Sequence, residues 1–389
     1  MQTSLSKADQ KELIGLRRFF HSHPELKFGE VKTSARIQEK LKEYGYQPQA
    51  GMAKTGVYAM HSDNKGRCIL LRADMDALPL QELNQVPYKS QNSQAMHACG
   101  HDMHMATLLM AAKHLKNEKI SGNLKFVFQP GEEGGNGALR MIEQGILKNP
   151  KVEAAFGLHV WSQIPTGQVA VSPGGIMASV DEFELTIRGK GGHGAMPHQT
   201  IDSIVVASHV VTTLQSILSR EIDPFDSVVV TIGKIQGGTT FNIIPEETVL
   251  KGTIRTMNKE TWKKIPRLFE RKIAGVTKAF GASYELKLNR DAPVTVNDPK
   301  MTEFVREIAR DVVGSANLVN ECRTMGGEDF AFILREVPGC FFFVGGRNEK
   351  KDYIHPHHSP RFNIDEGSLF VGVEMMKKIA KSYFSYFSK

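Results

Sequence analysis

Short apolar runs alternate with helical patterns along most of the chain, and this alternation constrains the fold more than any other feature. The apolar runs predict strands at residues 56–61, 68–72, 124–128, 154–158 and 340–344. Between and around them, helical spacing predicts helices at 7–20, 30–44, 104–115, 138–144, 301–313 and 366–384. This order predicts an α/β protein with a mixed, mostly parallel sheet and helices on both faces.

The pattern changes between residues 179 and 292. Strands and helices are predicted there at 183–188, 201–218, 228–235, 248–256, 259–280 and 283–288, in the order β-α-β-β-α-β. This order is the split unit of the ferredoxin-like fold. Because the first pattern resumes afterwards, we expect an inserted domain at 179–292 between two parts of a catalytic domain, 1–178 and 293–389.

Composition and charge exclude several classes of protein. The chain of 389 residues has a net charge of +7, but its Lys and Arg are scattered, so no nucleic-acid partner is expected. No apolar run approaches the length of a membrane span, and the N-terminus lacks the apolar core of a signal peptide. Four cysteines make no disulfide framework in so long a chain. We therefore expect no membrane association and a cytoplasmic location.

One stretch, MHACGHDMH at residues 96–104, concentrates groups that bind metals. The thiol of Cys99 and the imidazole of His101 stand two positions apart, and Zn²⁺ and similar ions prefer these ligands. A polar turn that begins a helix is the alternative interpretation. The stretch by itself leaves both open.

Further polar side chains follow the predicted strands. In an open α/β sheet the carboxyl ends of the strands form the crevice for ligands, so these side chains should converge with Cys99 and His101. The glutamates and histidines among them each have a plainer alternative: a solvated turn, a core histidine or an exposed side chain. The residues are Asp76, Glu132, Glu133, His159, His357 and His358.

The adjacent glutamates Glu132 and Glu133 suit a division of labour. Neighbouring side chains point in different directions, so one carboxylate can bind a metal while the other faces the substrate. A divalent cation lowers the pKa of water, and a carboxylate beside it can accept the proton. The pair therefore predicts metal-assisted hydrolysis of an amide.

Six blocks of the sequence resemble the amidohydrolase branch of the aminoacylase/carboxypeptidase metallopeptidases, peptidase family M20. The likeness extends from about Leu13 to the last predicted helix. The blocks are RADMDALP (72–79), MHACGHD (96–102), QPGEEG (129–134), GLHVW (157–161), GKGGHGAMPH (189–198) and FNIIP (241–245).

This resemblance implies a site for two divalent metal ions, with Zn²⁺ or Mn²⁺ expected and Co²⁺ or Ni²⁺ as alternatives. Glu132 would be the general acid/base, and the carboxylate of Asp76 would orient a ligand. Gly131 replaces the usual Ala of its block, and His357 stays an alternative to His358. The implied ligands are Cys99, which bridges the two ions, and His101, Glu133, His159 and His358.

The inserted domain is similar to the lid, or dimerisation, domain of that family, which implies a homodimer. His193 would then steady the oxyanion, from its own chain or from a dimer partner. Asn242 and Arg255 would contact the carboxylate of the substrate, and Gly326 would lie in a loop that lines the pocket. The alternatives are that Asn242 caps a turn and that Arg255 pairs with a surface acid.

These observations predict a metal-dependent amidohydrolase that cleaves the amide bond of small N-acyl amino acids. A broad-specificity metallocarboxypeptidase or dipeptidase on the same scaffold is the alternative. A metal-binding regulatory protein without activity is a third interpretation. Glu132 argues against it, because a pure binding site needs no second carboxylate.

Overall fold

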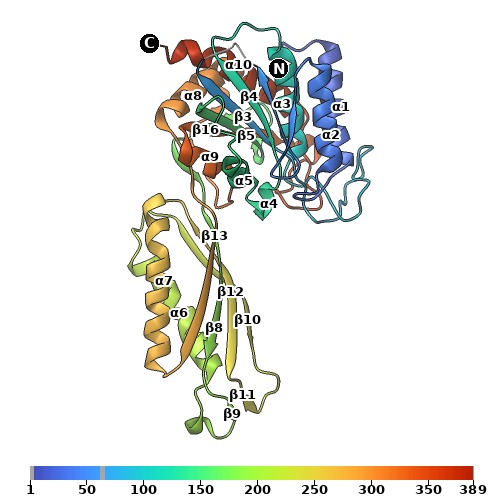
Figure 1. Cartoon of the computed structure of the whole chain (residues 1–389). Helices are drawn as coiled ribbons and strands as arrows, with labels where there is room; N and C mark the ends of the chain where they lie inside the picture. The colour runs from blue at the N-terminus through green and yellow to red at the C-terminus, as the bar shows by residue number, and fades with distance from the viewer. Residues whose placement is uncertain (1–3, 62–65, 389) are drawn as a thin grey trace. The chain divides into compact units, whose positions relative to one another are not determined.

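The computed structural model describes residues 4–61 and 66–388, which form two compact units. The first unit consists of Met1–Gly174, Val296–Cys322 and Asp329–Lys389, and the second of Gly175–Thr295 and Arg323–Glu328. Figure 1 shows the elements of both. The predicted boundaries of the inserted domain, near residues 178 and 292, stay a prediction.

The first unit is built on an eight-stranded sheet in the order β1-β2-β4-β3-β5-β16-β6-β15. Its four central strands, β4, β3, β5 and β16, run parallel, whereas β1 and β2 at one edge pair antiparallel. The mixed, mostly parallel sheet is therefore confirmed. The strands are β1 (Gln49–Met52), β2 (Gly56–His61), β3 (Cys68–Asp74), β4 (Asn123–Gln129), β5 (Val152–Pro165), β6 (Val169–Ala170), β15 (Leu318–Val319) and β16 (Gly339–Arg347).

Helices cover both faces of this sheet (Figure 1). On one face, α1 (Lys7–Ser22), α2 (Val31–Glu43), α3 (His101–Leu115), α8 (Pro299–Val313) and α10 (Gly367–Tyr386) enclose the main hydrophobic core. On the other lie the short helices α5 (Gly137–Glu143) and α9 (Phe330–Glu336), where the ring of Phe330 packs on Phe341 of β16. Ser6 caps α1 as its position predicts, by accepting a hydrogen bond from the backbone N–H of Asp9 (3.1 Å).

The second unit has a four-stranded antiparallel sheet in the order β10-β12-β8-β13. Its elements follow the predicted order β-α-β-β-α-β, and both helices pack on one face over a core that includes Phe183, Leu214 and Phe269. Two short strands, β9 (Gly192–His193) and β11 (Ile243–Ile244), pair with each other. The main elements are β8 (Val180–Arg188), α6 (Ser203–Arg220), β10 (Val228–Gly237), β12 (Glu247–Thr256), α7 (Lys259–Ala279) and β13 (Ser283–Ala292).

Several element bounds differ from the sequence-based predictions. Strand β5 continues to Pro165, so His159 lies in the middle of a strand and does not end one. Helix α3 begins at His101 and not at 104. The residue before it, Gly100, has a left-handed backbone (φ +92°) and offers no capping side chain, so no polar cap in the sequence marks this start. Helix α9 and the short strands carry too little periodic pattern to be predicted. No helix in the described part of the chain is both long and apolar enough to cross a bilayer.

Candidate metal centre

A tight turn before α3 places Cys99 and His101. Gly100 between them has φ +92°, and a Cβ atom there would lie 2.4 Å from Cγ2 of Val160 on β5. Only glycine fits so close to the strand in this conformation. The turn sets Cys99 just before the helix and His101 at its first position, both beside the central strands.

The imidazole of His101 is oriented by the backbone carbonyl of Asp76, whereas the prediction assigned this role to the Asp76 carboxylate. Its Nδ1 donates to the backbone carbonyl of Asp76 (2.8 Å), and its buried Nε2 has no hydrogen-bond partner among the described residues. Burial lowers the pKa of His101, but the carboxylates of Asp74, Asp76 and Glu133 outweigh it and raise that pKa to about 10. A divalent cation would supply the positive charge that these carboxylates favour.

His159 approaches the same point from β5. Its Nδ1 donates to the carbonyl of Val160 (2.6 Å), and its Nε2 lies 3.4 Å from Sγ of Cys99. Burial, together with nearby His104 and His357, holds the pKa of His159 well below its usual range. The imidazole is therefore neutral, and a neutral imidazole is the form that binds metals.

Glu132 and Glu133 sit on the short turn α4 (Glu132–Gly135), which follows β4. The carboxylate of Asp76 accepts a hydrogen bond from the backbone N–H of Glu132 (3.0 Å) and another from that of Glu133 (2.9 Å). One ligand atom each of Glu132, Glu133 and His101 lie within 4.8 Å of one another. The two carboxylates thus lie side by side at one site.

His358 faces this site and His357 does not. Nε2 of His358 lies 3.3 Å from Oε1 of Glu133, a buried oxygen that makes no hydrogen bond with the described residues. The half-buried ring of His357 stacks on Trp161, with 4.5 Å between ring centroids. Its ring nitrogens contact the carbonyl of Val160 (3.0 Å) and Oγ of Ser162 (3.2 Å). Because both nitrogens of His357 are engaged, the geometry favours His358 as the last ligand.

Two groups of three candidate ligands share the thiol of Cys99. One joins it to His101 and His159, the other to Glu133 and His358, and within each group the ligand atoms lie within 4.8 Å of one another. Two buried atoms, Nε2 of His101 and Oε1 of Glu133, lack hydrogen-bond partners among the described residues, as expected of atoms that bind a cation. The donor set of sulfur, imidazole nitrogen and carboxylate oxygen fits transition-metal ions.

In a third group, Asp74, His101 and His104, the ligand atoms also lie within 4.8 Å of one another. Here, however, His104 is hydrogen-bonded within the protein interior. His104 donates from Nδ1 to Asp74 (2.6 Å) and accepts at Nε2 from the backbone N–H of Val160 (2.9 Å). Both of its nitrogens are therefore used by the protein. His104 supports the strand that carries His159 and is not available as a ligand.

Buried ionic networks behind the site were missed by sequence reasoning. Arg72 donates to Asp74 (2.6 Å), to Oε1 of Gln129 (2.9 Å) and to Asp329 (3.1 Å), which ties the ends of β3 and β4 to the start of α9. On the other face of α3, Asp102 accepts from Arg17 (2.9 Å) and contacts Nδ1 of His21 (2.9 Å). Arg17 and His21 also hold the pKa of Asp102 below its usual range, against the effect of burial. Apart from Arg72 and Asp74, these partners lie too far apart in sequence for spacing to reveal them.

The predicted catalytic residue His193 and the predicted substrate-binding residue Asn242 lie at one end of the second unit. His193 on β9 pairs with Ile243 on β11, and the N–H of Gly194 donates to the carbonyl of Asn242 (2.9 Å). Nδ1 of the exposed His193 accepts from the N–H of Ala195 (3.0 Å). This contact leaves the proton on Nε2, so His193 presents an N–H donor to its surroundings.

The two remaining predicted substrate-binding residues, Arg255 and Gly326, lie at the opposite end of the second unit. Arg255 is the penultimate residue of β12, where its Nε donates to Oγ1 of Thr253 (3.1 Å), and burial lowers its pKa. The carbonyl of Gly326 accepts from the N–H of Ala178 (2.9 Å). The ten residues of β12 extend roughly 33 Å, and the β9–β11 pair lies beyond its first residue (Figure 1).

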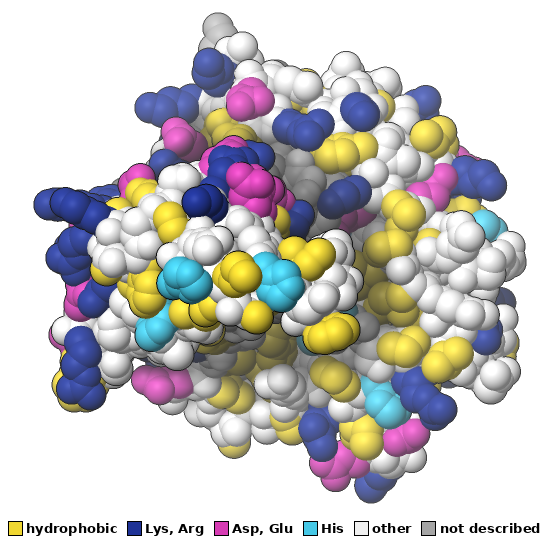
Figure 2. Space-filling model, turned by 90° about the horizontal axis from the view of Figure 1, so that it is seen from below, with side chains coloured by type: hydrophobic (Ala, Val, Ile, Leu, Met, Phe, Trp, Pro, Cys, Tyr) yellow, Lys and Arg dark blue, Asp and Glu magenta, His cyan; other side chains and the backbone are white. Residues whose placement is uncertain are grey.

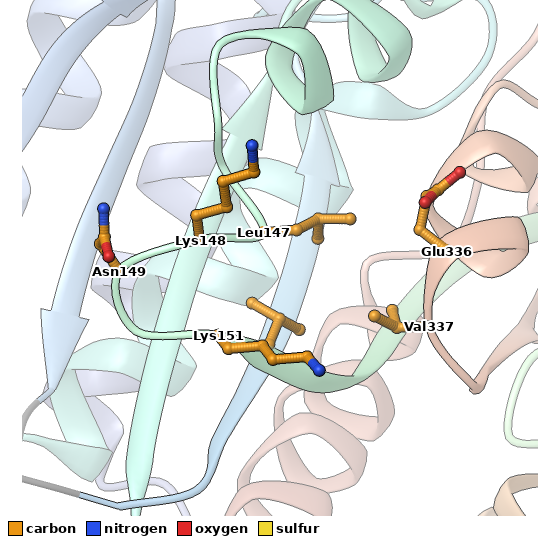
Figure 3. A pocket seen from close by; sticks show the side chains of 7 residues that line it. Leu147, Lys148, Asn149, Lys151, Glu336 and Val337 are labelled. Carbon is orange, nitrogen blue, oxygen red and sulfur yellow. The ribbon is translucent and has the colours of Figure 1, made fainter.

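A hollow of about 480 Å³ opens elsewhere on the first unit (Figure 3). Two exposed lysines and one glutamate contribute its charges. It shares no residue with the candidate metal centre. Its lining residues are Leu147, Lys148, Asn149, Lys151, Val152, Glu336 and Val337.

Comparisons with known proteins agree with this architecture. Residues 70–382 match the model of peptidase family M20/M25/M40. The chain is 39% identical to N-acetyl-L-cysteine deacetylase of Bacillus subtilis, covering 97% of this chain and 87% of the relative. It is 40% identical to thermostable carboxypeptidase 2 of Saccharolobus solfataricus, over 94% of this chain and 95% of the relative.

A solved structure gives the same result. The dinuclear metal-binding peptidase YXEP of Bacillus subtilis superposes with a TM-score of 0.85 at 34% identity, covering 98% of this chain and 99% of that one. Fold and sequence together define a hydrolase of the peptidase class. The chain belongs to peptidase family M20/M25/M40.

Proposed function

We propose that the protein binds two divalent cations and hydrolyses the amide bond of N-acyl amino acids. The observation that carries the proposal is the pair of ligand groups that share Cys99, with Glu132 beside them. Zn²⁺ and Mn²⁺ are the proposed ions, since thiolate favours the first and carboxylate suits the second. The proposed ligands are Cys99, His101, Glu133, His159 and His358.

When bound, the cations would polarise the amide carbonyl and lower the pKa of an attacking water. Glu132 takes a proton from that water as its oxygen bonds to the carbonyl carbon. The same carboxylic acid then gives the proton to the leaving nitrogen as the carbon–nitrogen bond breaks. Asp76 supports this role, because its carboxylate fixes the backbone amides of both Glu132 and Glu133.

The second unit supplies the proposed contacts to the substrate. Nε2–H of His193 donates to the carbonyl oxygen as negative charge develops on it. Asn242 and Arg255 bind the carboxylate of the amino acid, Arg255 through charge-assisted hydrogen bonds, and the loop at Gly326 lines the pocket. A free carboxylate next to the scissile amide is what N-acyl amino acids share.

The separation of these groups supports a homodimer as the working form. One second unit holds Arg255 and His193 at opposite ends of a strand far longer than a small N-acyl amino acid. Both can contact one substrate only if they come from two chains. Figure 2 looks onto the β9–β11 end of the second unit, where exposed hydrophobic side chains gather around histidines, as expected of a surface that a partner covers. Met196, Phe241 and Ile243 are the exposed apolar residues nearest in sequence to His193 and Asn242.

A reducing compartment suits this centre, because Cys99 must stay a thiolate to bind metal. We therefore place the enzyme in the cytoplasm. Its proposed partners are a second copy of the chain and small N-acyl amino acids.

The alternative substrate class is peptides. The 40% identity to thermostable carboxypeptidase 2 favours it, and a dipeptide carries the same free carboxylate beside an amide. The two functions differ in the group on the other side of the amide: an acyl group in one and an aminoacyl group in the other.

A substrate panel tests the proposal. Acetyl-, benzoyl- and indolylacyl amino acids and dipeptides are compared by kcat/KM, with Mn²⁺, Zn²⁺, Co²⁺ or Ni²⁺ added. We expect N-acyl amino acids to be cleaved fastest. Carboxamide analogues that lack the free carboxylate should lose roughly 10–100-fold in kcat/KM, since a hydrogen bond to a charged group is worth about 1.5–3 kcal/mol. Faster cleavage of dipeptides would favour the carboxypeptidase function.

A further inference from the structure

The loop 131–135, which carries Glu132 and Glu133, has little regular structure of its own. Gly131 and Gly134 have positive φ (+65° and +67°), and Glu133 lies outside the helical region. No ladder of helical hydrogen bonds can therefore fix the two carboxylates. Their positions depend on contacts from other parts of the chain.

Three consecutive backbone amides of this loop donate to buried carboxylates. Those of Glu132 and Glu133 donate to Asp76, as described above, and that of Gly131 donates to Oε1 of Glu30 (3.0 Å). Glu30 is fully buried, and its second oxygen accepts from Oγ1 of Thr55 (2.6 Å). Glu30 thus extends the row of acceptors that Asp76 begins.

Lys27 binds the same loop through its carbonyl groups. Its Nζ donates to the carbonyl oxygen of Glu133 (2.8 Å) and to that of Gly134 (3.1 Å). The segment 27–30 therefore offers a carboxylate to the N–H side of the loop and an ammonium to its C=O side. Hydrogen bonds with one charged partner are about twice as strong as neutral ones.

Phe28 fills the space beside two glycines of the loop. A Cβ atom at Gly131 would lie 2.7 Å from the Phe28 ring, and one at Gly135 would lie 2.8 Å from it. The guanidinium of Arg140 lies 4.3 Å from the centre of the ring on which it stacks. Gly131 therefore stands where a larger residue would push against Phe28.

We propose that segment 27–30 holds Glu132 and Glu133 in the geometry that the reaction needs, with Lys27, Phe28 and Glu30 as positioning residues. The proposal rests on the role assigned above to the glutamate pair. None of the three side chains is proposed to contact substrate or metal. They act on the backbone that carries the reacting carboxylate, so their loss should lower kcat and leave KM nearly unchanged.

A double-mutant cycle at Phe28 and Gly131 tests the packing contact. Gly131→Ala should lower kcat roughly 100-fold, the size expected when a reacting group is misplaced by about 1 Å. In a Phe28→Ala background the same substitution should cost far less, because the Cβ no longer meets the ring. Strain from a positive φ is equal in both backgrounds, so equal losses in kcat would overturn the contact with Phe28 as a positioning device.

Lys27 gives a second test that does not risk the fold, because its side chain is exposed. Lys27→Met should lower kcat roughly tenfold, about the worth of one charge-assisted hydrogen bond, and Lys27→Arg should restore most of it. Lys32→Met is the matched control, because Lys32 is also an exposed lysine and lies on α2, five positions further along the chain. Equal kcat in Lys27→Met and the control would overturn the proposal for Lys27.

Glu132→Gln, measured in parallel, distinguishes a wrong role for segment 27–30 from a wrong assignment of the general base. If Glu132→Gln is inactive while the Phe28, Gly131 and Lys27 variants keep the kcat of the unchanged enzyme, segment 27–30 has no positioning role and the proposed function stands. If Glu132→Gln keeps turnover, the assigned base is wrong, and the positioning proposal falls with it.

Discussion

Glu132→Gln should abolish amide hydrolysis and leave the bound metal in place. The substitution keeps the shape of the side chain but removes the group that accepts and returns the proton. General acid/base catalysis is typically worth about 10²–10⁴-fold in rate, and poorer activation of the attacking water would add to the loss. Turnover of an N-acyl amino acid and metal content per chain are the two measurements.

Glu133→Gln is the matched control for this prediction, because it makes the same chemical change one residue along. Glu133 is a proposed ligand, so its variant should lose metal and activity together. Near-native kcat in Glu132→Gln would contradict the assignment of the base. Loss of metal from Glu132→Gln would show that Glu132 acts as a ligand.

His193→Ala should lower kcat about 10²–10³-fold, the usual cost of removing a donor to a developing oxyanion. Metal content and thermal stability should not change, because the side chain is exposed and lies far in sequence from the proposed ligands. His198→Ala is the control, since His198 is also exposed and lies only five positions further along the chain. Full kcat in His193→Ala would remove the oxyanion donor from the mechanism.

The same variant tests whether the partner subunit supplies His193. Co-expression of His193→Ala and Glu132→Gln chains produces mixed dimers. Two inactive variants should then regain activity, because one site in each mixed dimer combines an intact Glu132 with the partner's intact His193. Absence of regained activity in isolated mixed dimers would show that His193 serves its own chain.

The side chains of the candidate metal centre come together by a topological rule that can be read from the sequence. Asp76, Glu132 and Glu133 come just after the parallel strands β3 and β4, so the sheet brings them to one edge. Cys99 and His101 join them because α3 packs on that sheet. Alternation of strands and helices predicted the arrangement, and local spacing predicted which side chains it would gather.

Contacts that pack one loop on another carry no such signal. Glu30 begins a helix in the sequence pattern, yet its carboxylate binds the amide of Gly131, 101 positions away. In the sequence, Gly131 only departs from the usual Ala of its block, whereas in the structure the ring of Phe28 takes the space beside it. The sequence predicts that His159 follows a strand at 154–158, but β5 continues past it to Pro165. The packing of side chains and hydrogen bonds between distant residues determine these contacts, and neither is visible in local sequence patterns.

The central claim is that two divalent ions, held through a shared Cys99, support the hydrolysis. Titration of chelator-treated protein with Zn²⁺ or Mn²⁺ tests it most directly, with hydrolysis of an N-acyl amino acid followed at each addition. The account predicts no activity without metal and full activity only at two equivalents per chain. Activity that saturates at one equivalent, or that survives complete removal of metal, would contradict it.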